Sequence, residues 1–350
     1  MKKRIESAFI DNAMPGTAPA IDQAVVARAM AGAIDSAVID STGAFFATAL
    51  HQIDPILNLP LAMFNWQDAV DIIPLDIATE VTTFDSMKVL ANGGVNPTKK
   101  SWVSGKTTEV GTVGIDLKRN SSPTALWAES VKRTTVELAQ AMLLNRPLDA
   151  MLLDALNFKK NIDLQNQVFT GDTELGVYGL LNNVTYVTPS SVAQNVAANS
   201  YLWVNKSDDE IIADINGILS AVQAASGYAL IPDTIGLPPA KLNYLITRKC
   251  GANASRSIMD YIMENNIGLK VYGKQIKFQP FRELINCGAG GSIDRMIAYV
   301  NNRECVRIPL SPMLSLPPQF VGMYQNVIYY MRFGCVEMKR PEGIAYRDGF

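Results

Sequence analysis

The single histidine of this 350-residue chain, His51, limits the chemistry that its side chains could perform. Serine and cysteine nucleophiles are commonly activated by an adjacent imidazole, so a catalytic triad of either kind would have to use this residue. His51 lies close to Asp54 and Pro55 in a segment interrupted by prolines, and the chain contains no G-x-S-x-G nucleophile elbow. We therefore interpret His51 as structural and predict no catalytic nucleophile.

Two glycine-rich segments differ from a phosphate-binding loop in the order of their elements. A P-loop lies between a strand and a helix and ends in Gly-Lys-Ser/Thr. The segment GDTELGVYGLL instead places Gly171, Gly176 and Gly179 after a predicted helix, and Val177 follows Gly176. We predict that these glycines shape the backbone, and that CGAGGS at 287–292 is a surface loop rather than a nucleotide site.

Paired carboxylates could act as a general acid and base, but the pairs in this chain have simpler interpretations. Asp208 and Asp209 are typical of the first turn of a helix, and Asp149 and Asp154 are expected to face solvent or a neighbour. The four cysteines show no metal-binding spacing: Cys250, Cys287, Cys305 and Cys335. We predict no catalytic, cofactor-binding or metal-binding residue, and scattered thiols are typical of a reducing cytoplasm.

The longest predicted element is a helix at about 147–170. Pro147 suits the first helical position and Gly171 suits the left-handed residue beyond the end. At 1.5 Å per residue, 148–169 would form a rod of about 33 Å. Its apolar residues recur at a three/four spacing and form one face: Leu148, Met151, Leu152, Ala155, Phe158, Ile162 and Phe169.

A β-rich excursion is predicted at 75–119, with apolar residues alternating along its second half. Gly93, Gly94, Asn96 and Pro97 are turn formers between the two strands. A two-stranded extension of this length is marginally stable alone, so it needs a partner surface. An ordinary hairpin with a solvated lysine pair at its tip is the alternative.

The remaining elements are predicted from caps, prolines and periodicity. Ser122 and Pro123 predict the start of a helix at 123–145, and Ser207 with Glu210 predicts a capping box for a helix that ends at Gly227. A hairpin is predicted at 269–281, around Gly273. The other predictions are a helix at 21–39, a strand and helix at 234–247, a helix at 255–266, and strands near 294–302, 304–310 and 327–349.

The segment VFTGDTELGVYGLLNN at 168–183, with the helix before it, resembles the spine helix and glycine loop of major capsid proteins of tailed bacteriophages. These proteins have the Hong Kong 97-type fold, which is shared with encapsulin shell proteins. The resemblance extends over about 50–350 and implies an α+β protein with four parts. These are an N-terminal arm at 1–50, an extended β loop at 75–119, a peripheral domain at 51–74, 120–185 and 313–350, and an axial α/β domain at 186–312.

The resemblance implies a shell protein that self-assembles, as pentamers and hexamers, into the icosahedral head around the double-stranded DNA of a tailed phage. It makes the loop tip a candidate for intersubunit contact: Gly93, Gly94, Lys99, Lys100 and Trp102. Some members form a lysine–asparagine cross-link, for which Lys99 or Lys100 has the right location, but no asparagine or glutamate can be matched. Separate scaffolding, portal and decoration proteins are further candidate partners.

Two alternatives remain open: an encapsulin-like compartment with protein cargo, and a cytosolic α/β enzyme or binding protein. A net charge of −2 without a basic stripe argues against sequence-specific nucleic-acid binding. The charged fraction of 18% is below the ~25% usual for soluble domains, which indicates surface buried against other chains or a large core. No signal peptide or membrane span is predicted. The location that the resemblance implies is a virion capsid assembled in the host cytoplasm.

Overall fold

The structure, a computed structural model, describes residues 60–91, 105, 112–143, 148–195, 199–251 and 256–350. The chain divides into two compact units, Met1–Pro60 and Leu61–Phe350, and almost all of the described residues belong to the second. Several predictions fall outside the described residues: the arm at 1–50 with its helix at 21–39, His51, Pro147, and the loop-tip residues Gly93, Gly94, Lys99, Lys100 and Trp102.

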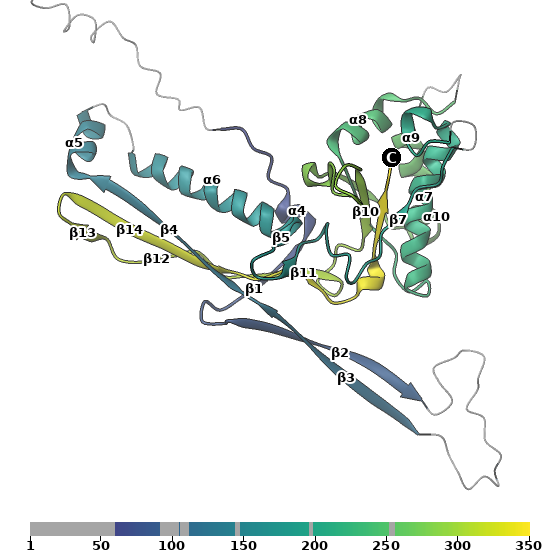
Figure 1. The fold of residues 1–350 in the computed structure, drawn as a ribbon, viewed down its shortest axis with the longest axis horizontal. Helices are drawn as coiled ribbons and strands as arrows, with labels where there is room; N and C mark the ends of the chain where they lie inside the picture. The colour runs from purple at the N-terminus through teal and green to yellow at the C-terminus, as the bar shows by residue number, and fades with distance from the viewer. Residues whose placement is uncertain (1–59, 92–104, 106–111, 144–147, 196–198, 252–255) are drawn as a thin grey trace, which may run out of the picture. The chain divides into compact units, whose positions relative to one another are not determined.

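The predicted long helix is confirmed as α6, Leu148–Phe169. It runs beside the long strands β4 (Ala125–Thr134) and β14 (Tyr324–Phe333), as Figure 1 shows. Its apolar residues are most completely buried toward the C-terminal end, where Leu164, Val168 and Phe169 enter the core. Nearer its start, Leu148, Leu152 and Ile162 are half-buried.

A seven-stranded sheet contains these two long strands, and β14 pairs with β4 over its whole length, from Tyr324↔Thr134 to Phe333↔Ala125. Strand β1 (Asp71–Pro74) pairs in parallel with β11 (Val306–Leu310), and β11 pairs in antiparallel orientation with β14. The remaining strands of the sheet are β12 (Leu314–Ser315), β13 (Gln319–Val321) and β15 (Glu337–Met338).

The predicted helix at 123–145 is wrong over most of its length. Residues 125–134 form β4, and the helix α5 covers only Thr135–Leu143. Side chains of β4 alternate between half-buried and exposed, with Trp127 and Val131 on the covered side and Leu126 and Ser130 on the other. The cap-like Ser122-Pro123 is overridden because pairing with β14 satisfies the backbone of this segment.

The predicted β excursion is confirmed as an antiparallel hairpin of β2 (Val81–Ala91) and β3 (Val113–Pro123). Eleven residue pairs run from Val81↔Pro123 to Ala91↔Val113. Strand β3 extends further than 119, and Thr124 alone separates it from β4. One nearly continuous strand therefore serves first the hairpin and then the seven-stranded sheet (Figure 1).

A second sheet has five strands in the order β7-β16-β10-β8-β9. Their bounds are Ser190–Ser191, Ile344–Asp348, Arg295–Tyr299, Thr234–Leu237 and Lys277–Pro280. This sheet separates two hydrophobic cores: on β10, Ile297 and Tyr299 face the core shared with α6, whereas Met296 and Ala298 face the core beneath α7 (Asp208–Ala225). Two strands do not follow the expected domain ranges. Strand β11 is within the axial range, 186–312, but lies in the seven-stranded sheet, whereas β16 is within the peripheral range, 313–350, but lies in the five-stranded sheet.

The helices around the second sheet include the predicted ones. The capping box of Ser207 and Glu210 starts α7, and the predicted strand-then-helix at 234–247 is confirmed by β8 and α8 (Pro239–Thr247). The helix within 255–266 is α9 (Ile258–Glu264). The remaining short elements are α4 (Trp66–Ala69), β5 (Gly171–Asp172), β6 (Val177–Tyr178), and 3-10 turns at Trp203–Asn205, Arg282–Leu284 and Pro341–Gly343.

The predicted hairpin at 269–281 is wrong. Its first half is the helix α10 (Ile267–Tyr272), and its second half is β9, which runs parallel to β8. Gly273 does make the predicted turn, but as the left-handed residue that ends α10, with φ 68°. Short apolar runs are ambiguous between helix and strand, and here Asn266 decides for a helix by capping the amide of Leu269 at 2.8 Å.

Candidate assembly surfaces

The glycine loop after α6 folds back onto the end of the helix. Gly171 has φ 74°, a conformation that favours glycine, and an added Cβ would lie 2.5 Å from the carbonyl oxygen of Val177. At Gly179 an added Cβ would lie 2.4 Å from both the carbonyl carbon and the oxygen of Phe169. Gly176 also has a positive φ, 65°, but lies in open space. The loop therefore needs glycine for close approach at Gly171 and Gly179, and for conformation alone at Gly176.

This close approach caps the helix. The amides of Leu180 and Leu181 donate to the carbonyl oxygens of Val168 and Phe169, at 2.7 and 3.1 Å. The side chain of Asn182 donates to the carbonyl oxygen of Thr170 at 2.6 Å and accepts from the amide of Gly179 at 2.8 Å. The last carbonyl groups of an α-helix have no hydrogen-bond partner within the helix. The loop supplies donors for them and so fixes the direction in which the chain leaves α6.

The β2–β3 hairpin exposes an apolar face. The cross-strand pairs Met87↔Leu117 and Val89↔Ile115 project to the same side, together with Val113. All five side chains are between 47% and 74% exposed. We call these five residues the apolar hairpin face. The Asp85–Arg119 ion pair, 3.0 Å, marks its inner limit on the same side.

The opposite side of the hairpin is mainly polar. Its pairs Ser86↔Lys118 and Lys88↔Asp116 alternate with those of the apolar face. A two-stranded ribbon has no interior of its own, so a polar side facing water is expected and a large apolar side is not. The difference between the two sides makes the apolar hairpin face a candidate contact surface.

A group of hydrogen bonds holds the base of the hairpin, and we call it the root clasp: Thr79, Glu80, Thr124 and Arg332. The hydroxyl of Thr124 donates to the carbonyl oxygens of Thr79 and Glu80, at 2.8 and 2.9 Å. The guanidinium of Arg332 donates to the carbonyl oxygen of Thr79 at 2.8 Å and to the hydroxyl of Thr124 at 3.2 Å. The root clasp thus ties β14 to the junction between hairpin and sheet.

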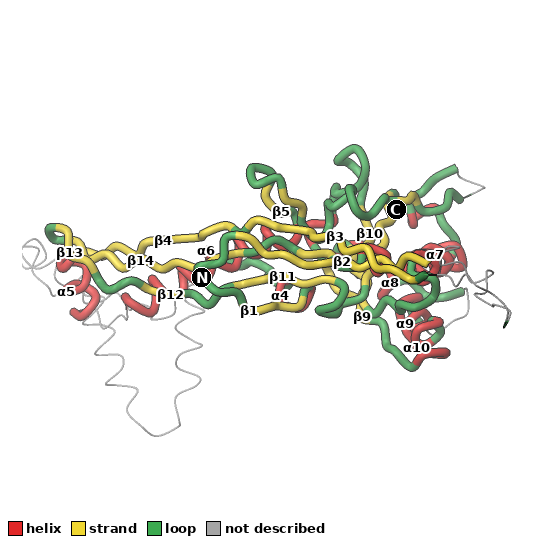
Figure 2. The backbone as a smooth tube through the Cα atoms, turned by 90° about the horizontal axis from the view of Figure 1, so that it is seen from below, coloured by secondary structure: helices red, strands yellow, loops and turns green. Residues whose placement is uncertain are grey.

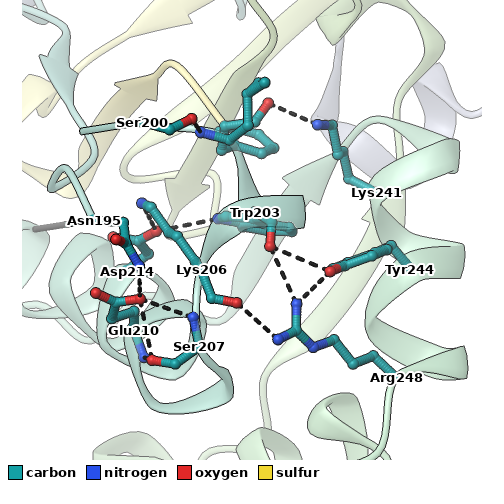
Figure 3. Close-up of polar contacts among 12 residues, drawn as sticks. Asn195, Ser200, Trp203, Lys206, Ser207, Glu210, Asp214, Lys241, Tyr244 and Arg248 are labelled. Carbon is teal, nitrogen blue, oxygen red and sulfur yellow. Dashed lines mark hydrogen bonds and ion pairs between the residues drawn. The ribbon is translucent and has the colours of Figure 1, made fainter. Parts of the chain in front are cut away.

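A buried polar network holds the segment before α7 (Figure 3). Lys206 and Asp214, both almost fully buried, form an ion pair of 2.5 Å, and the indole of Trp203 donates to the same carboxylate at 3.1 Å. Arg248 donates to the main-chain oxygens of Trp203 and Lys206, at 3.1 and 2.7 Å, and to Asp208 at 2.6 Å. Buried charges need such partners, so this network is structural.

A second buried pair crosses the five-stranded sheet. Arg295 on β10 and Asp348 on β16 are opposite each other in register and form two hydrogen bonds, of 2.7 and 2.9 Å. Arg295 also donates to the carbonyl oxygen of Leu181 at 2.8 Å, which joins the glycine loop to the sheet. The network therefore connects the segment after α6 with the five-stranded sheet.

The described residues contain no cluster of side chains suited to binding a metal ion. No group of three or more His, Cys, Asp or Glu side chains within them could hold a metal ion, and all four cysteines are free thiols. Asp149 pairs with Arg133, and Asp154 is exposed. The two most evident hollows lie between α6 and the β4–β14 pair, with volumes of about 260 and 320 Å³. Among the described helices, none has the length and apolar character needed to cross a membrane.

Comparison with known families places the fold. The family model described as "Major capsid protein" matches residues 99–350. This chain belongs to the major capsid protein family. The match includes β3, α6, its glycine loop, the five-stranded sheet and every strand of the seven-stranded sheet except β1, so the family assignment and the resemblance noted in the sequence concern the same elements.

Solved phage structures share the fold of this capsid protein. The capsid of Myoviridae phage XM1 covers 87% of this chain and 98% of its own, with a TM-score of 0.69 and 17% identity. The capsid of an empty GTA particle covers 90% and 99%, with a TM-score of 0.55 and 12% identity. A structure from Mycobacterium phage Ogopogo covers 88% and 98%, with a TM-score of 0.54 and 8% identity. The capsid protein therefore has the α+β, Hong Kong 97-type fold. No curated protein sequence matches it.

The candidate residues divide according to what the structure places together. Phe169, Gly171 and Gly179 lie together at the end of α6, where the loop caps the helix, while Gly176 lies at the outer turn of the loop. Leu148, Leu152 and Ile162 lie along α6. The root clasp and the Lys206–Asp214 pair were not predicted from the sequence. Asp214 was detectable, because it lies beside Ile211 and Ile215 on the apolar face of α7, where a carboxylate needs a partner.

Proposed function

We propose that this major capsid protein self-assembles, through pentamers and hexamers, into the icosahedral head of a tailed phage, which encloses double-stranded DNA. The observation that carries the proposal is the apolar hairpin face, five exposed apolar side chains on a ribbon that has no core of its own. The family match supports the same function. The role is structural, and no side chain of the described residues is assigned a chemical step.

The energetics of such a surface favour contact between many copies. Burying one large apolar side chain contributes ~1.5–3 kcal/mol, so one hairpin supplies a modest contact. In a closed shell every subunit both gives and receives this contact, and the contacts of each subunit act together. Weak individual interfaces then suffice for a stable particle, and copies of the same chain are the partner that this arrangement requires.

The parts of the fold have separate proposed roles. The axial domain, about 186–312, would meet its copies around the centre of each ring, and the peripheral domain with α6 would lie between rings. The hairpin at 75–119 and the arm at 1–50 would overlap neighbouring subunits, with contacts from Gly93, Gly94, Lys99, Lys100 and Trp102 at the loop tip. Separate scaffolding, portal and decoration proteins are proposed partners, and the proposed location is the virion after assembly in the host cytoplasm.

Negative-stain electron microscopy of the purified full-length protein tests the proposal. We expect icosahedral particles, tubes, or free pentamers and hexamers. A compact monomer that persists at high protein concentration would contradict it. Particles purified from infected cells are treated with nuclease, and their contents are then extracted. A phage head would contain DNA protected from the nuclease, whereas an encapsulin-like compartment would contain a cargo protein.

A further inference from the structure

One surface segment carries a local excess of positive charge that the overall composition conceals. The chain has a net charge of −2, yet residues 265–282 contain Lys270, Lys274, Lys277 and Arg282 and no aspartate or glutamate. All four side chains are exposed. We call Lys270, Lys274 and Lys277 the basic strip. The expectation that the chain has no basic stripe is therefore wrong at this place.

The amino groups of the basic strip are available for a ligand. Within the described part of the chain, none of these three lysines forms an ion pair or a side-chain hydrogen bond. The carboxylates close to the segment have other partners. Glu264 pairs with Arg256, and Glu283 accepts a hydrogen bond from Gln165 at 3.1 Å. The charge of the strip is consequently not neutralised by its own chain.

The backbone keeps the strip together on one surface. Lys270 is in the last turn of α10, and Gly273 ends that helix in the left-handed conformation. The amide of Lys274 then donates to the carbonyl oxygen of Gly268 at 3.0 Å, and the amide of Lys277 donates to that of Asp233 at 2.7 Å. Seven residues span at most ~23 Å, so the three lysines are confined to a short path from α10 to β9, two elements that Figure 2 labels.

Protection of a sheet edge is an alternative explanation for only one of the three. Lys277 lies on β9, the edge strand of the five-stranded sheet, where lysine discourages pairing with another chain. Lys270 and Lys274 are outside the strand, on α10 and in the turn after it. Tyr272, 48% exposed between them, adds a partly apolar, hydrogen-bonding side chain to the same surface.

We propose that the basic strip binds the phosphate backbone of the packaged duplex DNA, without reading its sequence. Duplex DNA presents one negative charge per ~1.7 Å of axis, so a short row of unpaired lysines can contact several phosphates at once. The strip faces the contents of the shell in this proposal, which rests on the function proposed above. Because the rest of the chain is acidic overall, this contact is local and weak for each subunit, and it allows DNA to slide during filling.

The test measures binding of a 30-base-pair duplex to the soluble full-length protein by fluorescence anisotropy, over a series of salt concentrations. The slope of log binding constant against log salt concentration is negative, and its magnitude should be smaller by about 2–3 in the K270Q/K274Q/K277Q variant. Each lost phosphate contact reduces this magnitude by ~0.9. The matched control is K88Q/K132Q/K249Q, which removes three other exposed lysines and has the same net charge. The control should keep the slope of the unmodified protein.

An unchanged slope in the K270Q/K274Q/K277Q variant, or an equal decrease in the control, overturns the proposal. Electron microscopy of both variants separates this result from the function proposed above. Particles that form normally while the slope is unchanged refute only the basic strip, whereas absence of particles from the unmodified protein refutes the shell function whatever the DNA measurement gives.

Discussion

At the scale of single residues, the end of α6 depends on the absence of two side chains. Gly171 and Gly179 allow the returning loop to reach the last carbonyls of the helix. The glycine pattern was readable in the sequence because glycine is the usual residue where φ is positive or two backbones approach closely. Which glycine serves which purpose was not readable, since the approach of Gly179 to Phe169 depends on the path of the whole loop.

Gly179→Ala should destabilise the protein by about 1–3 kcal/mol or more, because the added methyl group overlaps the backbone of Phe169, which cannot move away without uncapping α6. Chemical denaturation monitored by circular dichroism measures the change. Gly114→Ala is the matched control, since an added Cβ there meets nothing within 4 Å and should leave stability unchanged. Equal stability of the two variants would refute the capping role of the loop.

The buried thiol of Cys335 should make folding stability depend on pH in the alkaline range. Burial raises the pKa of Cys335 from 9.0 to about 12. Between these values the unfolded chain loses the thiol proton while the folded chain keeps it, so folding stability falls as pH rises, by at most ~1.4 kcal/mol per pH unit. Below pH 9 both states keep the proton and the effect vanishes.

Urea denaturation at pH 8, 9.5 and 11 tests this, with Cys335→Ala as the variant. Truncation lowers stability at every pH, but its cost should shrink from pH 9.5 to pH 11, because alanine has no proton to lose. Cys250→Ala is the comparison, since that thiol is only half-buried. A constant difference between Cys335→Ala and the unmodified protein at all three values would show that the thiol is not protonated preferentially in the folded state.

At the scale of elements, the strand shared by hairpin and sheet is the feature that sequence patterns misjudge. Ser122, Pro123 and the apolar spacing after them favour a helix locally, but ten backbone pairs with β14 decide for a strand. Those pairs join residues about 190–210 positions apart, which no local pattern records. In contrast, α6, α7 and the β2–β3 hairpin were predictable, because each has local signals: caps, apolar periodicity, or alternation around turn formers.

Thr124→Val should weaken the root clasp. Valine keeps the shape but lacks the hydroxyl that contacts Thr79, Glu80 and Arg332, so we expect a loss of about 0.5–1.5 kcal/mol, the net contribution of a typical hydrogen bond, because these contacts are only partly buried. Thr83→Val on the exposed side of β2 is the control and should change stability by less than ~0.5 kcal/mol. Thermal denaturation of both variants measures the difference, and similar melting temperatures would argue against the clasp.

Leu117→Asp tests the apolar hairpin face. Leu117 is 60% exposed in the isolated subunit, so the change should alter folding stability by less than ~0.5 kcal/mol while preventing assembly, because a carboxylate would be buried at the contact. Lys118→Asp, one residue further on the polar side of the strand, should still assemble. Sedimentation velocity measures assembly, and shells from Leu117→Asp would exclude this face from the interface.

At the scale of the whole molecule, the described core is complete without the hairpin. Two hydrophobic cores lie on the two faces of the five-stranded sheet, and the described hairpin residues 87–91 and 113–117 contribute to neither. The family and the fold could be anticipated from the glycine loop and the order of elements. The assignment of β11 and β16 to different sheets could not, because strand order is set by long-range pairing.

Removal of residues 93–106 should therefore leave a folded subunit that no longer forms closed shells. The hairpin strands remain, but the loop tip that would contact the neighbour is lost. Circular dichroism should match the unmodified protein, and electron microscopy should show only small oligomers. Intact shells from this variant would show that the loop tip is not needed for closure.

The continuity of β3 and β4 has a mechanical consequence. Thr124 is the only residue between them, so a displacement of the outer hairpin pulls along a single backbone into a ten-residue ladder with β14. No intervening loop can absorb that pull, and the ladder resists it with many hydrogen bonds loaded in shear. In the proposed shell, a pull by a neighbouring subunit on the hairpin is therefore carried by this ladder into the body of the subunit.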